Sequence, residues 1–292
     1  MLDVRKLRLL RELAHRETIA AVAESLNYTA SAVSQQLSAL EREAGVPLLE
    51  RTGRRVRLTS AGRTLVDHAG TIFAVLEQAG ADLAADHAAL TGPLRIGVFP
   101  TANRAILAPA LVALSTEHPR LELMVTELDP ILAPGALRTE ALDIALVQEY
   151  DYVPVDVDPA LDTEPLLAEI IYLAALSPGA LASHQRSQWV AGTPGTLCHT
   201  MTVRACQAAG FTPRIRHHAD DFGTVLELVA AGQGVALVPE LGARATPPAV
   251  ALTPLPTQRR THIAYRRGTG THPAISAART ALHSVIRRSR SG

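Results

Sequence analysis

Lysine, cysteine and aromatic residues are all scarce in this chain of 292 residues. Lys6 is the only lysine, a bias that we attribute to the base composition of the coding sequence. Cys198 and Cys206 are the only cysteines, and their spacing of eight residues differs from the Cys-x-x-Cys pairs of zinc and redox motifs. We therefore expect two reduced thiols in a cytosolic protein, with no metal and no cofactor.

Long apolar runs and enzyme motifs are also missing. No segment approaches the roughly 20 apolar residues of a membrane span, and arginines interrupt the leucines at the N-terminus, so we expect no export signal, no membrane contact and a soluble, cytoplasmic protein. The sequence has no GxSxG, HExxH or P-loop motif. "GQGVAL" at 232–237 lacks the last glycine of a dinucleotide fingerprint and leads from a helix into a strand, so we interpret it as a helix stop. These absences argue against an enzyme.

Charge is segregated along the chain although the formal net charge is zero. Residues 1–62 hold 10 basic and 7 acidic residues, residues 92–163 hold 4 and 11, and residues 259–292 hold 8 basic residues and no acid. A neutral overall charge therefore does not exclude a nucleic-acid partner for the N-terminal part.

The stretch "NYTASAVSQQLSALE" predicts a helix with two different faces. Val33, Leu37, Leu40 and Ala44 recur at helical spacing and form an apolar stripe. The opposite stripe holds Ser31, Gln35, Ser38 and Arg42 without any acid. Side chains that both donate and accept hydrogen bonds suit the edges of DNA bases, and a carboxylate-free face suits a polyanion. The alternative is a polar face packed against a partner domain.

The neighbouring segments complete a winged helix-turn-helix pattern. Thr18 can cap a short helix that ends at "LNY", Gly45 and Pro47 stop the second helix, and Val4, Leu7, Leu10 and Ala14 supply a third apolar stripe that closes the small core. "RTGRRVRL" predicts a hairpin, the wing, with a turn at Thr52-Gly53. Its arginines would contact phosphates or the minor groove, unless they are only a solvated charge cluster. The residues that we expect at DNA are Thr29, Ala30, Ser31, Ser34, Gln35, Ser38, Arg42, Arg51, Arg54, Arg55 and Arg57.

The pattern from Ala21 to Gly62 resembles the winged helix-turn-helix of the LysR-type transcriptional regulators in order, spacing and residue class. One departure is Ala30, where many members place a long polar residue near the start of the reading helix. The resemblance implies a homodimer or homotetramer that binds double-stranded DNA near promoters, acts on the transcription machinery and responds to a small coinducer.

A long helix follows the wing, from a cap at Thr59 or Ser60 to about Leu90. Leu65, Ile72, Leu76 and Leu83, with Ala69 and Ala79, alternate spacings of four and three, as in a helix that pairs with a second helix. We expect dimerisation through this seam, because two copies can span a two-fold symmetric DNA site. Packing of the seam on the chain's own C-terminal domain is the alternative.

From Leu94 onward, strands alternate with helices. The first series predicts strands at "LRIGVF", "LELMVT" and "ALDIALV" with helices at 103–116 and 131–139, which is a parallel α/β pattern. A second series runs from "LLAEIIYLAAL" to "VALVP", and the chain returns through "RRTHIAYRR" to a final helix near 273–288. Both the pattern and the resemblance predict two lobes, joined near Thr163 and Arg260, with a cleft that binds a ligand.

The strand ends and helix starts define the expected effector site. It comprises Pro100, Thr101, Asn103, Asp129, Gln148, Glu149, Thr193, Thr196, His199, Asp220 and Phe222. The helix start at Pro100 favours a carboxylate, with simple N-capping by Thr101 as a compatible alternative. The acids at the rim indicate a ligand that also carries an amine or guanidinium, such as an amino acid, unless they are solvated loop carboxylates. His217 and His218 are adjacent on a strand and face opposite ways, which argues against a shared metal.

We therefore predict an α+β multidomain protein. Residues 1–62 form the winged helix-turn-helix, 59–90 the linker and dimerisation helix, and 92–292 a two-lobed, periplasmic-binding-protein-like effector domain, with lobe 1 at 92–163 and 265–292 and lobe 2 at 164–264. The predicted function is effector-controlled, sequence-specific transcriptional regulation. The alternative is a small-molecule-binding or enzymatic α/β protein whose helix-turn-helix serves only protein assembly.

Overall fold

The computed structural model describes residues 1–52, 55–85, 90–154 and 157–291, and the side chains of all of these except 51, 52, 55 and 289–291. The chain divides into two compact units, one of Met1–Asp86 with Arg266–His272 and one of His87–Tyr265 with Pro273–Gly292. Among the helices of the described residues, none combines the length and the apolar composition needed to cross a bilayer.

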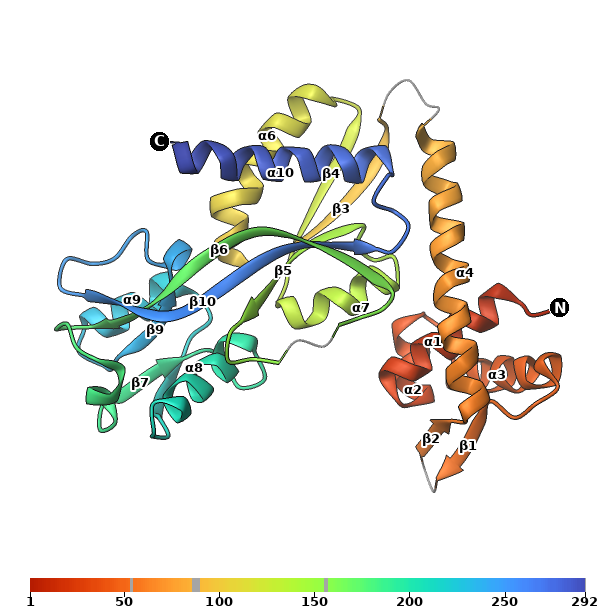
Figure 1. Cartoon of the computed structure of the whole chain (residues 1–292), viewed down its shortest axis with the longest axis horizontal. Helices are drawn as coiled ribbons and strands as arrows, with labels where there is room; N and C mark the ends of the chain where they lie inside the picture. Colours follow the sequence, from red (N-terminus) through yellow and green to blue (C-terminus); the bar gives the residue numbers. More distant parts are fainter. Residues whose placement is uncertain (53–54, 86–89, 155–156, 292) are drawn as a thin grey trace. The chain divides into compact units, whose positions relative to one another are not determined.

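The first unit is a helical bundle with a hairpin and a long helix (Figure 1). Its elements are α1 (Val4–Arg16), α2 (Ile19–Ser25), α3 (Ala30–Ala44), β1 (Leu49–Thr52), β2 (Arg55–Leu58) and α4 (Ser60–Ala85). Thr18 and Thr29 cap α2 and α3 by accepting hydrogen bonds from the backbone N–H groups of Ala21 and Ala32, both at 3.2 Å. The hydroxyl of Thr59 accepts from the N–H of Gly62 at 3.0 Å, which caps α4.

The core of this unit lies between the apolar stripes of α1 and α3. Val33, Leu37 and Leu40 of α3 are fully buried in one cluster with Leu7 and Leu10 of α1, as their spacing predicts. Two details of the prediction are wrong. Val4 is 40% exposed and lies outside this cluster, because it occupies the first turn of α1, whereas Leu9 and Leu13 are buried.

The second incorrect detail is the wing turn. Thr52 pairs with Arg55 across the hairpin and belongs to β1, so it is not a turn residue. The other predicted turn residue, Gly53, lies outside the described residues.

The second unit is built on one six-stranded sheet with the order β4-β3-β5-β10-β6-β9. Its strands are β3 (Gly92–Val98), β4 (Leu121–Glu127), β5 (Ile144–Tyr150), β6 (Leu161–Ala175), β9 (Ala236–Pro239) and β10 (Ala251–Arg266). β3 runs parallel to β4 and β5, which confirms the predicted parallel arrangement, whereas β10 runs antiparallel to β5 and β9 antiparallel to β6. A separate parallel pair joins β7 (Gln188–Ala191) to β8 (Arg214–His218).

Two long strands carry the chain through the unit. β6 and β10 cross its whole length in Figure 1, so the chain passes Thr163 and Arg260 inside continuous strands and not in separate crossover segments. Helices α8 (Leu197–Ala208) and α9 (Phe222–Ala230) begin at one end of the β7–β8 pair, after Thr196 and Asp221 as caps.

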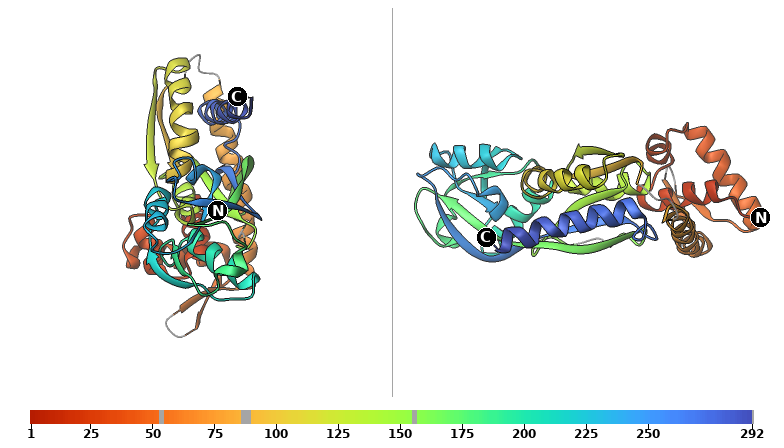
Figure 2. Two further views of the ribbon diagram at one scale, coloured as in Figure 1. Left: turned by 90° about the vertical axis from the view of Figure 1, so that its left-hand side faces the viewer. Right: turned by 90° about the horizontal axis from the view of Figure 1, so that it is seen from above.

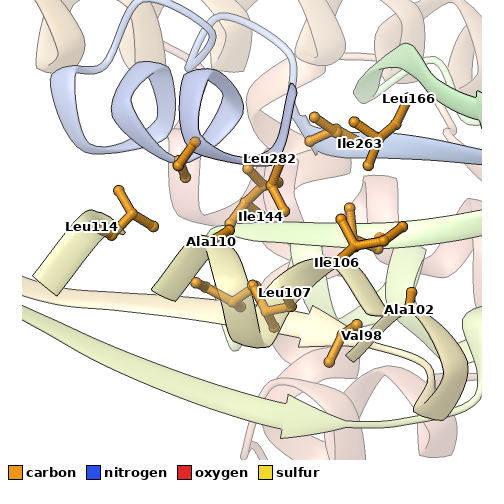
Figure 3. Packing of buried hydrophobic residues seen from close by; sticks show 14 of the residues in the cluster. Val98, Ala102, Ile106, Leu107, Ala110, Leu114, Ile144, Leu166, Ile263 and Leu282 are labelled. Atoms are coloured by element: carbon orange, nitrogen blue, oxygen red, sulfur yellow. The ribbon is translucent and has the colours of Figure 1, made fainter. Parts of the chain in front are cut away.

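The largest core of the second unit lies between the sheet and two helices. Helix α6 (Ala108–Glu117) and helix α10 (Pro273–Ser291) lie side by side over the sheet (Figure 2). Figure 3 shows Ile106 and Leu107 between Val98 of β3 and Leu282 of α10. This packing fixes the helix start at Pro100 relative to the strand ends.

The helix after β3 differs from its predicted span of 103–116. It starts at Pro100, as α5 (Pro100–Ala102), and passes through a π-helical turn at Asn103–Leu107 before α6. Proline fits the first turn of a helix because no N–H is required there. The remaining short elements are a 3₁₀ turn (Pro130–Leu132), α7 (Ala133–Arg138) and the 3₁₀ turns Leu181–His184 and Glu240–Gly242.

Candidate DNA-reading helix and effector cleft

The polar stripe of α3 faces outward within the first unit. Ser31, Gln35, Ser38 and Arg42 are all exposed, while the opposite stripe is buried. Gln35, Ser38 and Arg42 line a shallow groove of about 810 Å³ that ends at Pro47. The stripe is therefore not packed inside its own unit.

One acid does line this groove, but its side chain is engaged. Glu41 Oε1 accepts hydrogen bonds from the backbone N–H groups of Leu48 and Leu49 at 2.9 and 3.0 Å. Glu41 thus holds the segment after α3 and contributes less repulsion toward a phosphate than a free carboxylate would.

The other expected DNA contacts occupy varied positions. Ala30 is exposed and Ser34 is half-buried, while the Thr29 hydroxyl is occupied in capping α3 and lies 3.1 Å from the Ser31 hydroxyl. Arg57 is exposed on β2, and Val56 and Leu58 pack against the core of the unit, as the alternation predicts. Arg54, and the side chains of Arg51 and Arg55, lie outside the described residues.

The seam on α4 is largely uncovered within its unit. Ile72, Leu76 and Leu83 are exposed, and Leu65 is half-buried beside the core of the first unit. Ala69 is fully buried in that core, so the N-terminal part of the seam serves intramolecular packing and the later part remains free.

A cavity of about 380 Å³ lies in the second unit where helix starts and strand ends meet. It is lined by Phe99, Pro100, Thr101, Arg104, Glu127, Leu128, Asp129, Pro130, Gln148, Thr193, Thr196, Cys198, Asp220, Phe222 and Arg259. The cavity brings together segments that are far apart in the sequence, because residues near 100 and 130 lie opposite residues near 195 and 220.

Arg259 of β10 forms the centre of a buried polar network in this cavity. Its Nη2 lies 3.0 Å from both carboxylate oxygens of Glu169 and donates to the Thr101 hydroxyl at 3.0 Å. Its Nη1 donates to Gln148 Oε1 at 3.2 Å, and its guanidinium carbon lies 5.0 Å from the centre of the Phe99 ring. Both Arg259 and Glu169 are almost fully buried. The Nε of Arg259 has no hydrogen-bond partner within the described part of the chain.

Cys198 lies beside this network. Its Sγ is 3.2 Å from the Tyr150 hydroxyl and 3.8 Å from Gln148 Nε2. Burial raises the pKa of the Cys198 thiol and outweighs the Tyr150 hydrogen bond and the Arg259 charge, which lower it. Burial and the adjacent Cys198 also raise the pKa of Tyr150 well above its usual value. Both groups are therefore neutral near pH 7.

Charged groups surround the mouth of the cavity. Arg104 Nη2 forms an ion pair with Asp221 Oδ2 at 3.0 Å. The backbone N–H of Thr224 and then the Arg104 guanidinium lower the pKa of Asp221, so that its carboxylate remains charged. Asp220 accepts from the N–H and hydroxyl of Thr193 at 2.8 and 2.6 Å.

Eight of the eleven residues predicted for the effector site line the cavity. They are Pro100, Thr101, Asp129, Gln148, Thr193, Thr196, Asp220 and Phe222. Thr101 does not cap the helix, because it already lies inside the first turn and its hydroxyl accepts from Arg259.

Three predicted residues do not line the cavity. Glu149 alternates to the other side of β5 from Gln148, where it lies 3.5 Å from His262 Nε2. Asn103 is not a lining residue, although its side-chain amide donates at 3.2 Å to Glu127, which does line the cavity. His199 lies in the first turn of α8, with its ring 5.9 Å from that of His218. The described residues contain no cluster of three or more side chains that could hold a metal ion.

The buried centre of the site was not among the residues that the sequence pattern predicted. Arg259 lies within a long strand, and Cys198 directly precedes the predicted His199. Phe99, Arg104, Leu128 and Pro130 also line the cavity and were not among the expected site residues. Most of the missed residues are sequence neighbours of a predicted site residue and could have been found that way. Arg259 is not adjacent to any predicted site residue.

The fold, the exposed polar stripe of α3 and the cavity of the second unit together define a class of protein: a DNA-binding regulator with a ligand-binding domain. The chain belongs to the LysR family of transcriptional regulators. Residues 4–63 match the family described as "Bacterial regulatory helix-turn-helix protein, lysR family", and residues 87–287 match the "LysR substrate binding domain". Proteins of this family bind double-stranded DNA and small-molecule effectors, form oligomers and are not enzymes.

Individual relatives are similar at moderate identity. The transcriptional dual regulator GltC of Bacillus subtilis is 29% identical over 248 residues, which cover 82% of this chain and 81% of GltC. The transcriptional dual regulator OxyR of Escherichia coli is 29% identical over 261 residues, or 85% of this chain and 81% of OxyR.

Solved structures share the fold along the whole chain. The Corynebacterium glutamicum OxyR C206 mutant is 25% identical with a TM-score of 0.58, and the match covers 100% of this chain and 93% of that one. CbnR in complex with its target DNA has a TM-score of 0.54 at 21% identity, covering 97% of this chain and 100% of CbnR, a likeness of fold alone.

Proposed function

We propose that α3 enters the major groove of DNA and reads bases chiefly through Gln35, with Ser31, Ser34, Ser38 and Arg42 alongside it. The observation that carries this proposal is the exposed stripe of hydrogen-bonding side chains on α3. Glutamine can form paired hydrogen bonds with adenine, and serine can bond to any base edge. Arg57, with the wing arginines Arg51, Arg54 and Arg55, supplies contacts to phosphates that do not depend on sequence. Thr29 and Ala30 bring the helix start close to the backbone.

Binding competition on specific and random DNA tests this division of roles. Gln35→Ala should lower affinity for the specific site by about 1–3 kcal/mol and leave affinity for random DNA nearly unchanged. Arg57→Ala should weaken binding to both DNAs and reduce the salt dependence of binding. Gln207→Ala, an exposed glutamine on α8, is the matched control and should change neither affinity.

The rival function, in which the helix-turn-helix serves only protein assembly, makes the opposite prediction. It expects no preference of the unmodified protein among DNA sequences and little salt sensitivity. An equal loss on specific and random DNA for Gln35→Ala would remove the reading role of that residue.

The domain organisation that we propose assigns DNA binding, dimerisation and effector binding to three successive parts of the chain. Residues 1–62 bind DNA, residues 59–90 pair two copies through Leu65, Ile72, Leu76 and Leu83, and residues 92–292 bind the effector. Within the last domain, 92–163 and 265–292 form one lobe and 164–264 the other. Dimers or tetramers in the cytoplasm then act on the transcription machinery at promoters.

The proposed effector is an amino acid or a small carboxylate held in the 380 Å³ cavity. Support comes from the eight predicted residues that line it and from its mixed surface, since Phe99, Leu128 and Phe222 adjoin buried polar groups. Such a pocket, mostly apolar with a few fixed polar groups, is typical of small-molecule sites. The proposed effector site leaves out Asn103, Glu149 and His199, which do not line the cavity.

A further inference from the structure

The two arginines of the cavity are already paired with carboxylates. Arg259 is bound to Glu169, and each of these side chains is about 1% exposed. Arg104 is bound to Asp221 at 3.0 Å. Neither guanidinium therefore offers an uncompensated positive charge to an incoming anion.

Three carboxylates that line the same cavity have no such partner. Glu127 accepts only from the neutral amide of Asn103, Asp129 Oδ1 only from the backbone N–H of Ile131, and Asp220 only from Thr193. Within the described part of the chain none of the three forms an ion pair. With both arginines neutralised, the cavity carries three formal negative charges.

A second feature of the cavity, independent of these acids, calls for an acceptor on the ligand. The side chain of Arg259 is buried, and its Nε has no partner in the described residues. A buried donor without a partner is unfavourable, and because this nitrogen is shielded from the open cavity, a ligand oxygen relieves that cost only when neighbouring lining side chains shift. The charge balance and the Arg259 donor together specify two different groups on one ligand.

We propose, resting on the regulatory function above, that the effector is a small organic cation with an oxygen acceptor, such as a basic amino acid. Its ammonium or guanidinium group binds against Asp129, and its acceptor binds near Arg259. Asp129 is the best placed of the three acids, because one carboxylate oxygen caps the turn at Ile131 while the other has no hydrogen-bond donor among the described residues. An anion such as a dicarboxylate would instead meet three uncompensated negative charges, of which that of the half-buried Asp129 is the least screened, since Glu127 and Asp220 are exposed to solvent.

Calorimetric titration and thermal shift on the full chain test the proposal with four probes: L-arginine, L-lysine, L-glutamate and succinate. Arginine or lysine should raise the melting temperature and bind at least about tenfold more tightly than glutamate or succinate. Asp129→Asn should lower that affinity about tenfold or more. Asparagine keeps an oxygen that can cap Ile131, so this variant removes the charge without removing the cap.

Glu122→Gln provides the matched control, because Glu122 is an exposed carboxylate on the same strand as Glu127 but does not line the cavity. It should leave the affinity unchanged. The proposal is overturned if glutamate or succinate binds more tightly than arginine and lysine, if none of the four binds, or if Asp129→Asn binds the cations as well as the unmodified chain does. Competition between specific and random DNA, measured on the same preparations, keeps this failure separate from failure of the regulatory function, since that competition needs no effector.

Discussion

At the scale of single residues, the ion pair of Arg259 and Glu169 is the feature with the largest expected effect on stability. Both side chains are about 1% exposed, and Glu169 also accepts from the backbone N–H of Leu241 at 3.0 Å. Removing one partner leaves a buried charge without compensation, so Arg259→Met should lower the free energy of unfolding by about 3–5 kcal/mol. Urea denaturation followed by circular dichroism measures this change.

Two further variants make that prediction specific. Arg260→Met removes the neighbouring arginine, whose ion pair with Asp151 is partly exposed, and should cost no more than about 1 kcal/mol. The double variant Arg259→Met with Glu169→Leu should be less destabilised than Arg259→Met alone, because no buried charge remains. A double variant that loses as much as the sum of its single variants would contradict this account.

The cysteines supply a prediction about pH. Only the thiolate reacts with alkylating agents and peroxides, and burial raises the pKa of Cys198, so the thiolate fraction at a given pH falls below that of a free cysteine. In a Cys206→Ser variant, alkylation of Cys198 by iodoacetamide at pH 7.5 should be much slower than that of free cysteine. The rate should keep rising with pH beyond the ordinary thiol pKa of about 8.5.

Unfolding the same variant in urea should restore the rate of a free thiol, which controls for the reagent. A fast reaction of the folded chain at pH 7.5 would contradict this prediction. It would show that Cys198 is ionised at that pH and can be oxidised by peroxides. Burial likewise raises the pKa of the Cys206 thiol, to about 12.

At the scale of elements, the sequence predicted best what depends on neighbours along the chain. The period of Val33, Leu37 and Leu40 and the helix stop at Gly45, which is left-handed (φ 70°), define α3 within one local segment. Strands β3, β5 and β9 of the second unit were also recognisable, because each contains a short apolar run between turn signals.

What depends on pairing across the sheet was less predictable. Nothing in the sequence distinguishes Arg259 from Arg260, yet alternation along β10 buries the first and exposes much of the second. Pairing with β5 sets the face on which each arginine lies. Arg260 pairs with Glu149 and shares its face, whereas Thr261, which lies on the same face of β10 as Arg259, pairs with Gln148. The same alternation places Gln148 in the cavity and Glu149 outside it, although the sequence argument treated the two alike.

At the scale of the whole molecule, we expect two copies to associate through the exposed seam of α4. Ile72, Leu76 and Leu83 are exposed at spacings of four and seven residues on one side of the helix. Apolar side chains at this spacing pair well with a second helix, and a dimer places two copies of α3 on one two-fold symmetric site. Leu76 is 51% exposed within one chain, so a charged residue there leaves the fold of a single copy intact while it opposes pairing.

Leu76→Glu should therefore shift the protein toward monomers in analytical ultracentrifugation, because each copy would bring a carboxylate into an apolar interface. Affinity for a two-fold DNA site should fall by at least about tenfold, while the weak affinity for half a site is retained. Thr71→Glu, an exposed position on α4 away from the seam, is the control and should remain dimeric. If Leu76→Glu stayed dimeric with full affinity, the copies would have to associate through another surface.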